Sequence, residues 1–142
     1  MFHRLSYPFP LVVIDRLVEV ERGKSIRTAK WVTANEFTLA GHFPGEPTLP
    51  GVLTLEGIIQ SALILVAESH DRGRLTGSLE KVERIRFKRA IVPGDRVDFL
   101  VSLMAMEGDF WKFKGKAQVG GETAADADVT LKVINREVGF DL

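Results

Sequence analysis

The stretch that decides the fold is VLTLEGIIQSALILVAE, residues 52–68. Its apolar residues leave a helix with no polar face to present to solvent, so the helix must be buried. Five small or polar residues interrupt it: Thr54, Glu56, Gly57, Gln60 and Ser61. A membrane-spanning helix needs about 20 nearly uninterrupted apolar residues. The stretch therefore predicts a buried core helix, entered through Pro50-Gly51.

Extended segments with alternating apolar and polar residues surround this helix. The clearest is WKFKGKAQV, residues 111–119, whose alternation is typical of a half-buried antiparallel strand. Similar segments cover residues 11–20, 25–33, 96–106 and 127–134, and turn signals stand at 22–24, 93–95, 107–109 and 120–121. One apolar helix among five to six long strands predicts an α+β domain, with a curved antiparallel sheet wrapped round the helix.

Composition narrows the functional classes. A chain of 142 residues, 45% of them hydrophobic, predicts one compact domain over residues 1–142. Nineteen basic and 19 acidic residues give no overall field that attracts nucleic acid or an anionic membrane. The chain has no cysteine and only three scattered histidines, His3, His42 and His70, so we expect no metal site. The first residues lack the apolar core of a signal peptide, and we expect a cytoplasmic protein.

A histidine, a turn, a helix start and a carboxyl group stand together in GHFPGEPTLPGVLTLE, residues 41–56. Imidazole is the side chain that titrates closest to neutral pH, and a carboxyl group on an apolar helix is costly unless it is paired or used. His42 and Glu56 therefore indicate proton-transfer chemistry. Gln60, at i+4 from Glu56, shares its helical face and is placed to orient the carboxyl group. The alternatives are a structural ion pair for Glu56 and a satisfied core amide for Gln60.

The same block resembles the bacterial (3R)-hydroxyacyl-[acyl carrier protein] dehydratases of the FabZ type, which have a hotdog fold. The match runs without gaps from Asp15-Arg16 through Asn35-Glu36, GHFP and PGVL to Gln60. Phe87, Pro93-Gly94-Asp95 and WKFKG look like later landmarks of the family. The resemblance implies that His42 and Glu56 are the catalytic pair, each from a different subunit of a dimer. Glutamate at position 56 favours the FabZ type over the FabA type, which also isomerises the double bond.

The implied reaction converts a (3R)-3-hydroxyacyl-acyl carrier protein to the trans-2-enoyl product without a metal or redox cofactor. It belongs to fatty acid, polyketide or aryl polyene biosynthesis. Elimination needs a base at C2, a site for negative charge on the thioester oxygen, and an acid at the C3 hydroxyl. Neutral His42 would be the base, and the backbone N–H of Gly51 or Val52 would polarise the carbonyl. Glu56, desolvated on its helix, would be kept protonated as the acid.

The resemblance also implies partners. They are an acyl carrier protein and a second copy of the chain, with a trimer of dimers as the expected larger assembly. Because the carrier protein is acidic, a basic rim is expected near the tunnel mouth, and the candidates are Lys81, Arg84, Arg86, Lys88 and Arg89. The alternative for this stretch is a solvated strand face.

The expected acyl tunnel is lined by Phe43, Leu49, Pro50, Ser78 and Leu79. Ser78-Leu79 stands where the family commonly has a Tyr-Phe pair, which predicts a wider tunnel and a different acyl chain. Tyr7-Pro8-Phe9-Pro10-Leu11 also replaces the family's usual His-Arg-Tyr-Pro-Phe run.

Two other functions fit the same sequence. A hotdog thioesterase would use a carboxylate and the helix N-terminus but release a free thiol. A non-catalytic subunit would bind acyl chains or the carrier protein without turnover.

Overall fold

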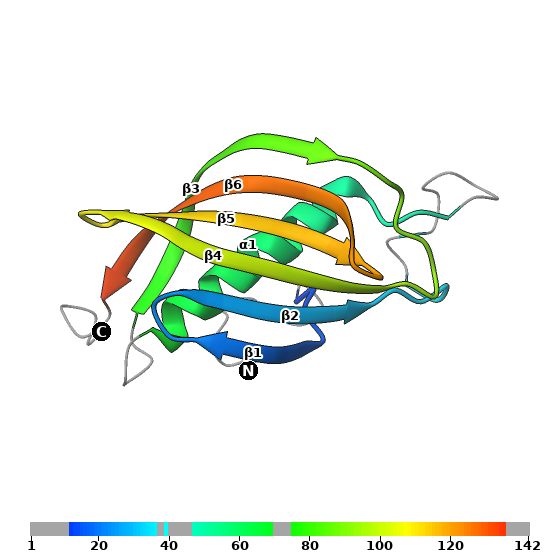
Figure 1. Cartoon of the computed structure of the whole chain (residues 1–142), viewed down its shortest axis with the longest axis horizontal. Helices are drawn as coiled ribbons and strands as arrows, with labels where there is room; N and C mark the ends of the chain where they lie inside the picture. Colours follow the sequence, from blue (N-terminus) through cyan, green and yellow to red (C-terminus); the bar gives the residue numbers. More distant parts are fainter. Residues whose placement is uncertain (1–11, 37–38, 40–46, 70–74, 136–142) are drawn as a thin grey trace.

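The computed structural model describes residues 12–36, 39, 47–69 and 75–135. In these residues one helix lies inside the curve of a single antiparallel sheet (Figure 1). The elements in chain order are β1 (Arg16–Glu21), β2 (Ser25–Trp31), α1 (Gly51–Glu68), β3 (Leu75–Phe87), β4 (Arg96–Glu107), β5 (Phe110–Val119) and β6 (Glu122–Asn135). The predicted α+β architecture and its central helix are confirmed.

The strand order in the sheet is β1-β2-β4-β5-β6-β3, and all neighbours pair antiparallel. The turn signals at residues 22–24, 93–95, 107–109 and 120–121 all lie between paired strands or at their ends. Strand β3 follows the helix and pairs with β6, so it forms one edge of the sheet. Strand β1 forms the other edge, and the outer backbone groups of both edge strands have no paired strand within the described residues.

Two segments differ from the sequence-based prediction. Strand β3 was not among the predicted extended segments, because its sequence LTGSLEKVERIRF has few apolar residues and lies mostly at the surface. Strand β1 begins at Arg16 and not at residue 11. Residues 13 and 14 are instead buried, and the backbone N–H of Val13 bonds to Gln60 on the helix. The Val13 N–H thus bonds to the Gln60 side chain on the helix instead of pairing with a neighbouring strand.

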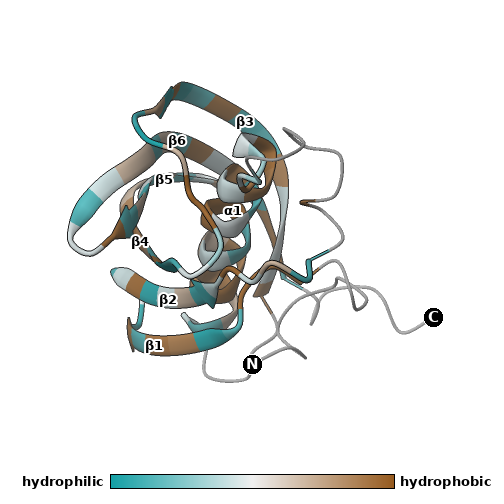
Figure 2. Cartoon of the chain, turned by 90° about the vertical axis from the view of Figure 1, so that its right-hand side faces the viewer, coloured by the Kyte–Doolittle hydropathy of each residue, from teal (hydrophilic) through white to brown (hydrophobic). Residues whose placement is uncertain are grey.

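Glycine allows the helix to approach the sheet closely. A Cβ at Gly57 would lie 2.2 Å from the ring of Phe99 on β4, and a Cβ at Gly115 on β5 would lie 2.3 Å from Cγ2 of Ile58. Both contacts are far shorter than van der Waals separation, so any larger residue would push the helix out. Seen from the end in Figure 2, the helix is enclosed by the strands. By length and composition α1 could span a membrane, but 67% of it is buried in the structure, as in the core helix of a soluble protein.

Candidate active site

The first turn of α1 is held in place from both sides. Leu49, just before the helix, donates its N–H to the carbonyl of Ile91 at 2.8 Å, and Leu53 donates to the carbonyl of Pro50 at 2.9 Å. The N–H groups of Gly51 and Val52 lie at the start of the helix, where no preceding turn supplies a carbonyl partner. The helix dipole adds partial positive charge at this end. These two amides therefore form a site suited to a developing negative charge.

Glu56 lies in the second turn of α1, and its carboxylate is bound by Gln60. Gln60 is fully buried, and its Oε1 accepts a hydrogen bond from the N–H of Val13 at 2.8 Å. Because the amide oxygen is committed to a backbone donor, its Nε2 must be the atom that donates to Oε1 of Glu56, at 3.1 Å. Among the described residues no lysine or arginine forms an ion pair with Glu56. The carboxyl group is thus held by an amide, and Glu56 as a whole is partly exposed.

His42 and Phe43 lie outside the described residues, as do His3, His70 and the segment Tyr7–Leu11. The nearest buried residues among the described ones on either side of His42 are Leu39 and Leu49, each 5% exposed. The N–H of Leu39 donates to the carbonyl of Glu36 at 3.1 Å. The geometry between His42 and Glu56 stays a prediction.

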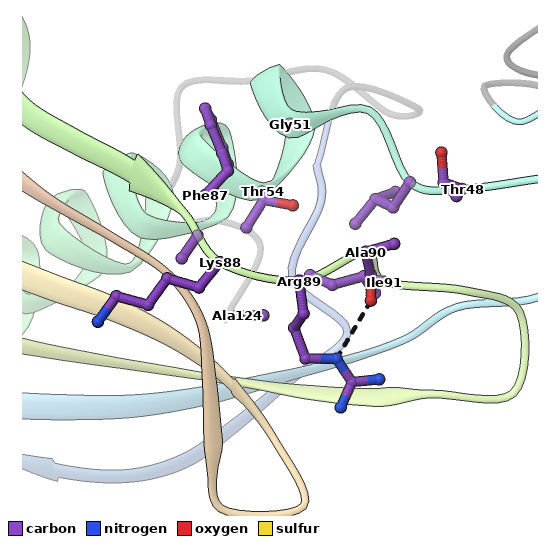
Figure 3. A pocket seen from close by; sticks show the side chains of 11 residues that line it. Thr48, Gly51, Thr54, Phe87, Lys88, Arg89, Ala90, Ile91 and Ala124 are labelled. Atoms are coloured by element: carbon purple, nitrogen blue, oxygen red, sulfur yellow. Dashed lines mark hydrogen bonds between the residues drawn. The ribbon is translucent and has the colours of Figure 1, made fainter.

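A cavity of about 640 Å³ opens beside the first turn of the helix (Figure 3). Gly51 and Thr54 line it from α1, Phe87 to Ile91 line it from the segment after β3, and Ala124 and Ala125 line it from β6. The ring of Phe87 packs on Gly51 so closely that a Cβ there would lie 2.9 Å from Cε1 of Phe87. Because position 51 is glycine, the Phe87 ring can lie directly against the start of the helix, where both line one cavity.

Of the predicted tunnel residues, the structure brings only some to this cavity. Leu49 lines it and Pro50 is adjacent at the start of the helix. Ser78 and Leu79 lie near the opposite end of β3, where a Cβ at Gly77 would be 3.2 Å from Leu63. A single chain therefore does not place Ser78 or Leu79 beside Gly51.

Thr54 and Phe87 are lining residues that the sequence did not assign to a site. In the sequence, Thr54 is only a polar interruption of an apolar helix, and Phe87 is only a landmark of the family resemblance. Neither position carries a local signal, since the contact between residues 51 and 87 arises only when β3 folds back along the helix.

The predicted basic rim lies on β3 and just after it, and its cations are paired. The ion pairs are Lys81–Glu83 at 3.3 Å, Arg84–Asp128 at 3.2 Å, Arg86–Asp126 at 3.0 Å, Lys88–Asp126 at 3.3 Å and Arg89–Glu122 at 3.4 Å. The hydrogen bond from Arg86 holds the pKa of Asp126 below its usual value, and Lys88 acts in the same direction while partial burial opposes both. In Figure 3 the amine of Lys88 points away from the cavity. This geometry matches a solvated strand face, and a role in carrier binding stays a prediction.

Solved structures identify the class of fold. The chain superimposes on a hot-dog-like protein from Thermanaerovibrio acidaminovorans with a TM-score of 0.66 and 19% identity, covering 80% of this chain and 83% of that one. It superimposes on the dehydratase heterocomplex ApeI:P from Xenorhabdus doucetiae with a TM-score of 0.77 and 17% identity, covering 94% and 90%. At these identities the likeness shows the fold, and the predicted hotdog fold is confirmed.

Sequence comparison narrows the class to a family. The FabA-like domain family matches residues 5–128. A 3-hydroxyacyl-[acyl-carrier-protein] dehydratase FabZ from Oleidesulfovibrio alaskensis is 40% identical over 139 residues, covering 94% of this chain and 88% of the relative. The FabZ of Oceanobacillus iheyensis is 36% identical over 129 residues, covering 91% and 92%. The chain belongs to the FabA-like family, among relatives of the FabZ type, and the resemblance drawn from the sequence is confirmed.

Proposed function

We propose that this chain is a dehydratase that eliminates water from a (3R)-3-hydroxyacyl-acyl carrier protein to give the trans-2-enoyl thioester. The observation that carries the proposal is the Glu56 carboxyl group, held by buried Gln60 about one turn after the first amides of the helix, those of Gly51 and Val52. The FabZ relatives, which match nearly the full chain, support it. We place the reaction in the cytoplasm, in fatty acid biosynthesis or a related pathway.

Each proposed role follows from the position of its group. The substrate carbonyl accepts a hydrogen bond from Gly51 or Val52, which stabilises the enolate-like charge formed when C2 loses its proton. His42, in its neutral form, removes that proton. Protonated Glu56 then donates its proton to the departing C3 hydroxyl, which leaves as water. The hydrogen bond from Gln60 holds the carboxyl group in one orientation. The Glu56 side chain therefore does not have to reorient before it transfers the proton.

The active unit is proposed to be a homodimer that pairs through β3. Three large apolar residues on or at this edge strand are exposed: Leu79 at 48%, Ile85 at 43% and Phe87 at 57%. An exposed, partly apolar edge is a template for pairing with another strand. Antiparallel pairing centred between Val82 and Glu83 would set Ser78 of one subunit opposite Phe87 of the other, with Leu79 next to it. That arrangement supports the predicted tunnel role of Ser78-Leu79, which a single chain does not provide.

The proposed partner is an acyl carrier protein. Arg86 and Lys88, at the end of β3, share Asp126 as their counter-ion, so these two cations carry one more positive charge than their acidic partner. This positive charge would attract an acidic carrier protein, and the main effect would be a faster rate of association. A trimer of dimers is the larger assembly that we propose.

The reverse reaction tests the function. Purified protein is mixed with a crotonyl thioester, and loss of the enoyl absorbance reports hydration. We expect His42→Ala and Glu56→Gln each to lower kcat by about 100-fold or more, because each removes a general acid or base. Glu56→Gln keeps a hydrogen-bonding partner for Gln60, so its melting temperature should stay close to that of the wild type. Hydration at the wild-type rate in His42→Ala would contradict the mechanism.

The same samples separate the alternatives. A thiol-trapping dye would report free thiol if the chain were a thioesterase, and hydration would then be absent. A non-catalytic subunit would bind the carrier protein but change neither signal. The FabZ relatives, which match nearly the full chain, favour the dehydratase over both.

A further inference from the structure

One wall of the cavity is the short segment 88–91, which follows β3. Its backbone is tied at both ends. The N–H of Lys88 donates to the carbonyl of Ala124 on β6 at 2.7 Å, and the carbonyl of Ile91 accepts from the N–H of Leu49 at 2.8 Å. Leu49 lies two residues before the first residue of α1. The position of this segment therefore helps to set where the helix begins.

The Arg89 side chain joins this segment to two other parts of the chain. Its Nη1 lies 3.4 Å from a carboxylate oxygen of Glu122, the first residue of β6, and its Nη2 lies 3.6 Å from Oδ2 of Asp95, the residue before β4. Its Nε donates to the carbonyl of Ala90 at 3.2 Å. The same oxygen of Asp95 accepts the N–H of Val92 at 3.0 Å. One guanidinium group thus holds the segment against the starts of two strands.

The direction of Arg89 differs from that expected of a substrate-binding group. In Figure 3 its side chain extends away from Gly51 and Thr54. A planar guanidinium group presents its donors in a fixed fork, so it can hold several oxygen atoms of the protein at once. Because the side chain is 31% exposed, its ion pairs add little to stability. The main consequence to expect is therefore the position of the segment.

We propose that Arg89 is a positioning residue for the amides of Gly51 and Val52. It holds segment 88–91, whose last carbonyl binds Leu49, and Leu49 leads into the helix start. This inference rests on the proposed function, in which these amides bind the thioester carbonyl. A displacement of about 1 Å in such donors weakens the stabilisation of the enolate-like charge. Arg89 itself takes no part in proton transfer.

A carrier-free substrate tests the inference. Hydration of crotonyl-N-acetylcysteamine needs no docking of a carrier protein, so its rate reports the active site alone. We expect Arg89→Gln to lower kcat about 3- to 10-fold and to change KM by less than about 2-fold, because the amides act mainly on charge that forms in the transition state. Glu122→Gln, which removes one of the two ion pairs, should give a smaller fall in kcat.

Arg96→Gln is the matched control. Arg96 also binds an aspartate at the surface, with bonds to Asp98 at 3.1 and 3.2 Å, but it is not among the described residues that line the cavity. It should keep the wild-type kcat. All rates are measured at a temperature at which circular dichroism shows every variant folded.

The outcomes are separable. A wild-type kcat in Arg89→Gln overturns the inference, and a loss confined to carrier-linked thioesters would assign Arg89 to carrier binding instead. An equal fall in kcat in Arg96→Gln overturns it as well, because the loss would then be general. A rise in KM at constant kcat also contradicts it. A wild-type protein that hydrates no thioester overturns the proposed function, and the inference with it.

Discussion

Gln60 donates a hydrogen bond from Nε2 to Oε1 of Glu56 at 3.1 Å while its own oxygen accepts from the backbone of Val13 at 2.8 Å. The helix carboxylate is thereby tied, through one buried amide, to the segment that leads into β1. This link joins two parts of the chain that are 47 residues apart.

Replacement of Gln60 should affect both activity and stability. Gln60→Leu fills a similar volume but leaves the Val13 N–H without its acceptor, so we expect a loss of about 1–3 kcal/mol in the free energy of unfolding. We also expect kcat to fall about 10-fold with a smaller change in KM, because the carboxyl group is no longer oriented. Urea denaturation and hydration assays measure the two effects.

Ser61→Ala is the matched control for Gln60→Leu. Ser61 is also fully buried on α1, and its hydroxyl bonds to Thr28 and to the carbonyl of Gly57 but not to Glu56. It should lower stability without a comparable fall in kcat. Equal kcat losses in the two variants would show that Gln60 acts only through stability.

Gly57→Ala should destabilise the protein although alanine is the better helix former. The new Cβ would lie 2.2 Å from the ring of Phe99, so the helix or the ring must move. Overpacking of this kind costs about 1–3 kcal/mol, which outweighs a gain in helix propensity of up to about 1 kcal/mol. The double variant Gly57→Ala with Phe99→Leu should recover part of the loss in urea denaturation. A fully stable single variant would be inconsistent with the close contact.

Asp126 should make stability depend on pH in the acid range. Two hydrogen bonds from Arg86, at 3.0 and 3.1 Å, hold its folded-state pKa below the unfolded value of about 3.9. The stabilisation is therefore complete above the unfolded pKa and is lost as the pH falls through the lower, folded pKa. Wild type should exceed Asp126→Asn by about 0.5–1 kcal/mol at pH 6, and the difference should shrink toward pH 3. Arg86→Gln should reduce the difference at pH 6, whereas a gap that widens on acidification would refute this assignment.

The proposed dimer predicts that charge on the β3 edge weakens association. Leu79→Glu replaces an exposed apolar side chain by a carboxylate that would be desolvated in the interface, and sedimentation velocity should show a larger monomer fraction. Met104→Glu is the control, because Met104 is 63% exposed on β4, away from that edge. Equal association of wild type and Leu79→Glu would argue for a different interface.

Much of the fold was readable from the sequence because the signals are local. The predominantly apolar character of residues 52–68, with no polar face, predicts a buried helix, and the alternation in residues 111–119 predicts a half-buried strand. Strand β3 escaped prediction because an edge strand with charges on both faces has no clear two-residue period. The spacing between Glu56 and Gln60 placed them on one helical face, and the structure joins them by a hydrogen bond.

The sequence by itself determined the central helix, the antiparallel sheet around it, the family and the candidate pair His42 and Glu56. Only the tertiary structure decided that Val13 orients Gln60, that Phe87 packs on Gly51, and that the cations of β3 meet the aspartates of β6. The physical reason is the range of the interactions. Helix burial, strand alternation and i+4 spacing are properties of neighbouring residues, whereas these contacts exist only after the sheet has closed round the helix.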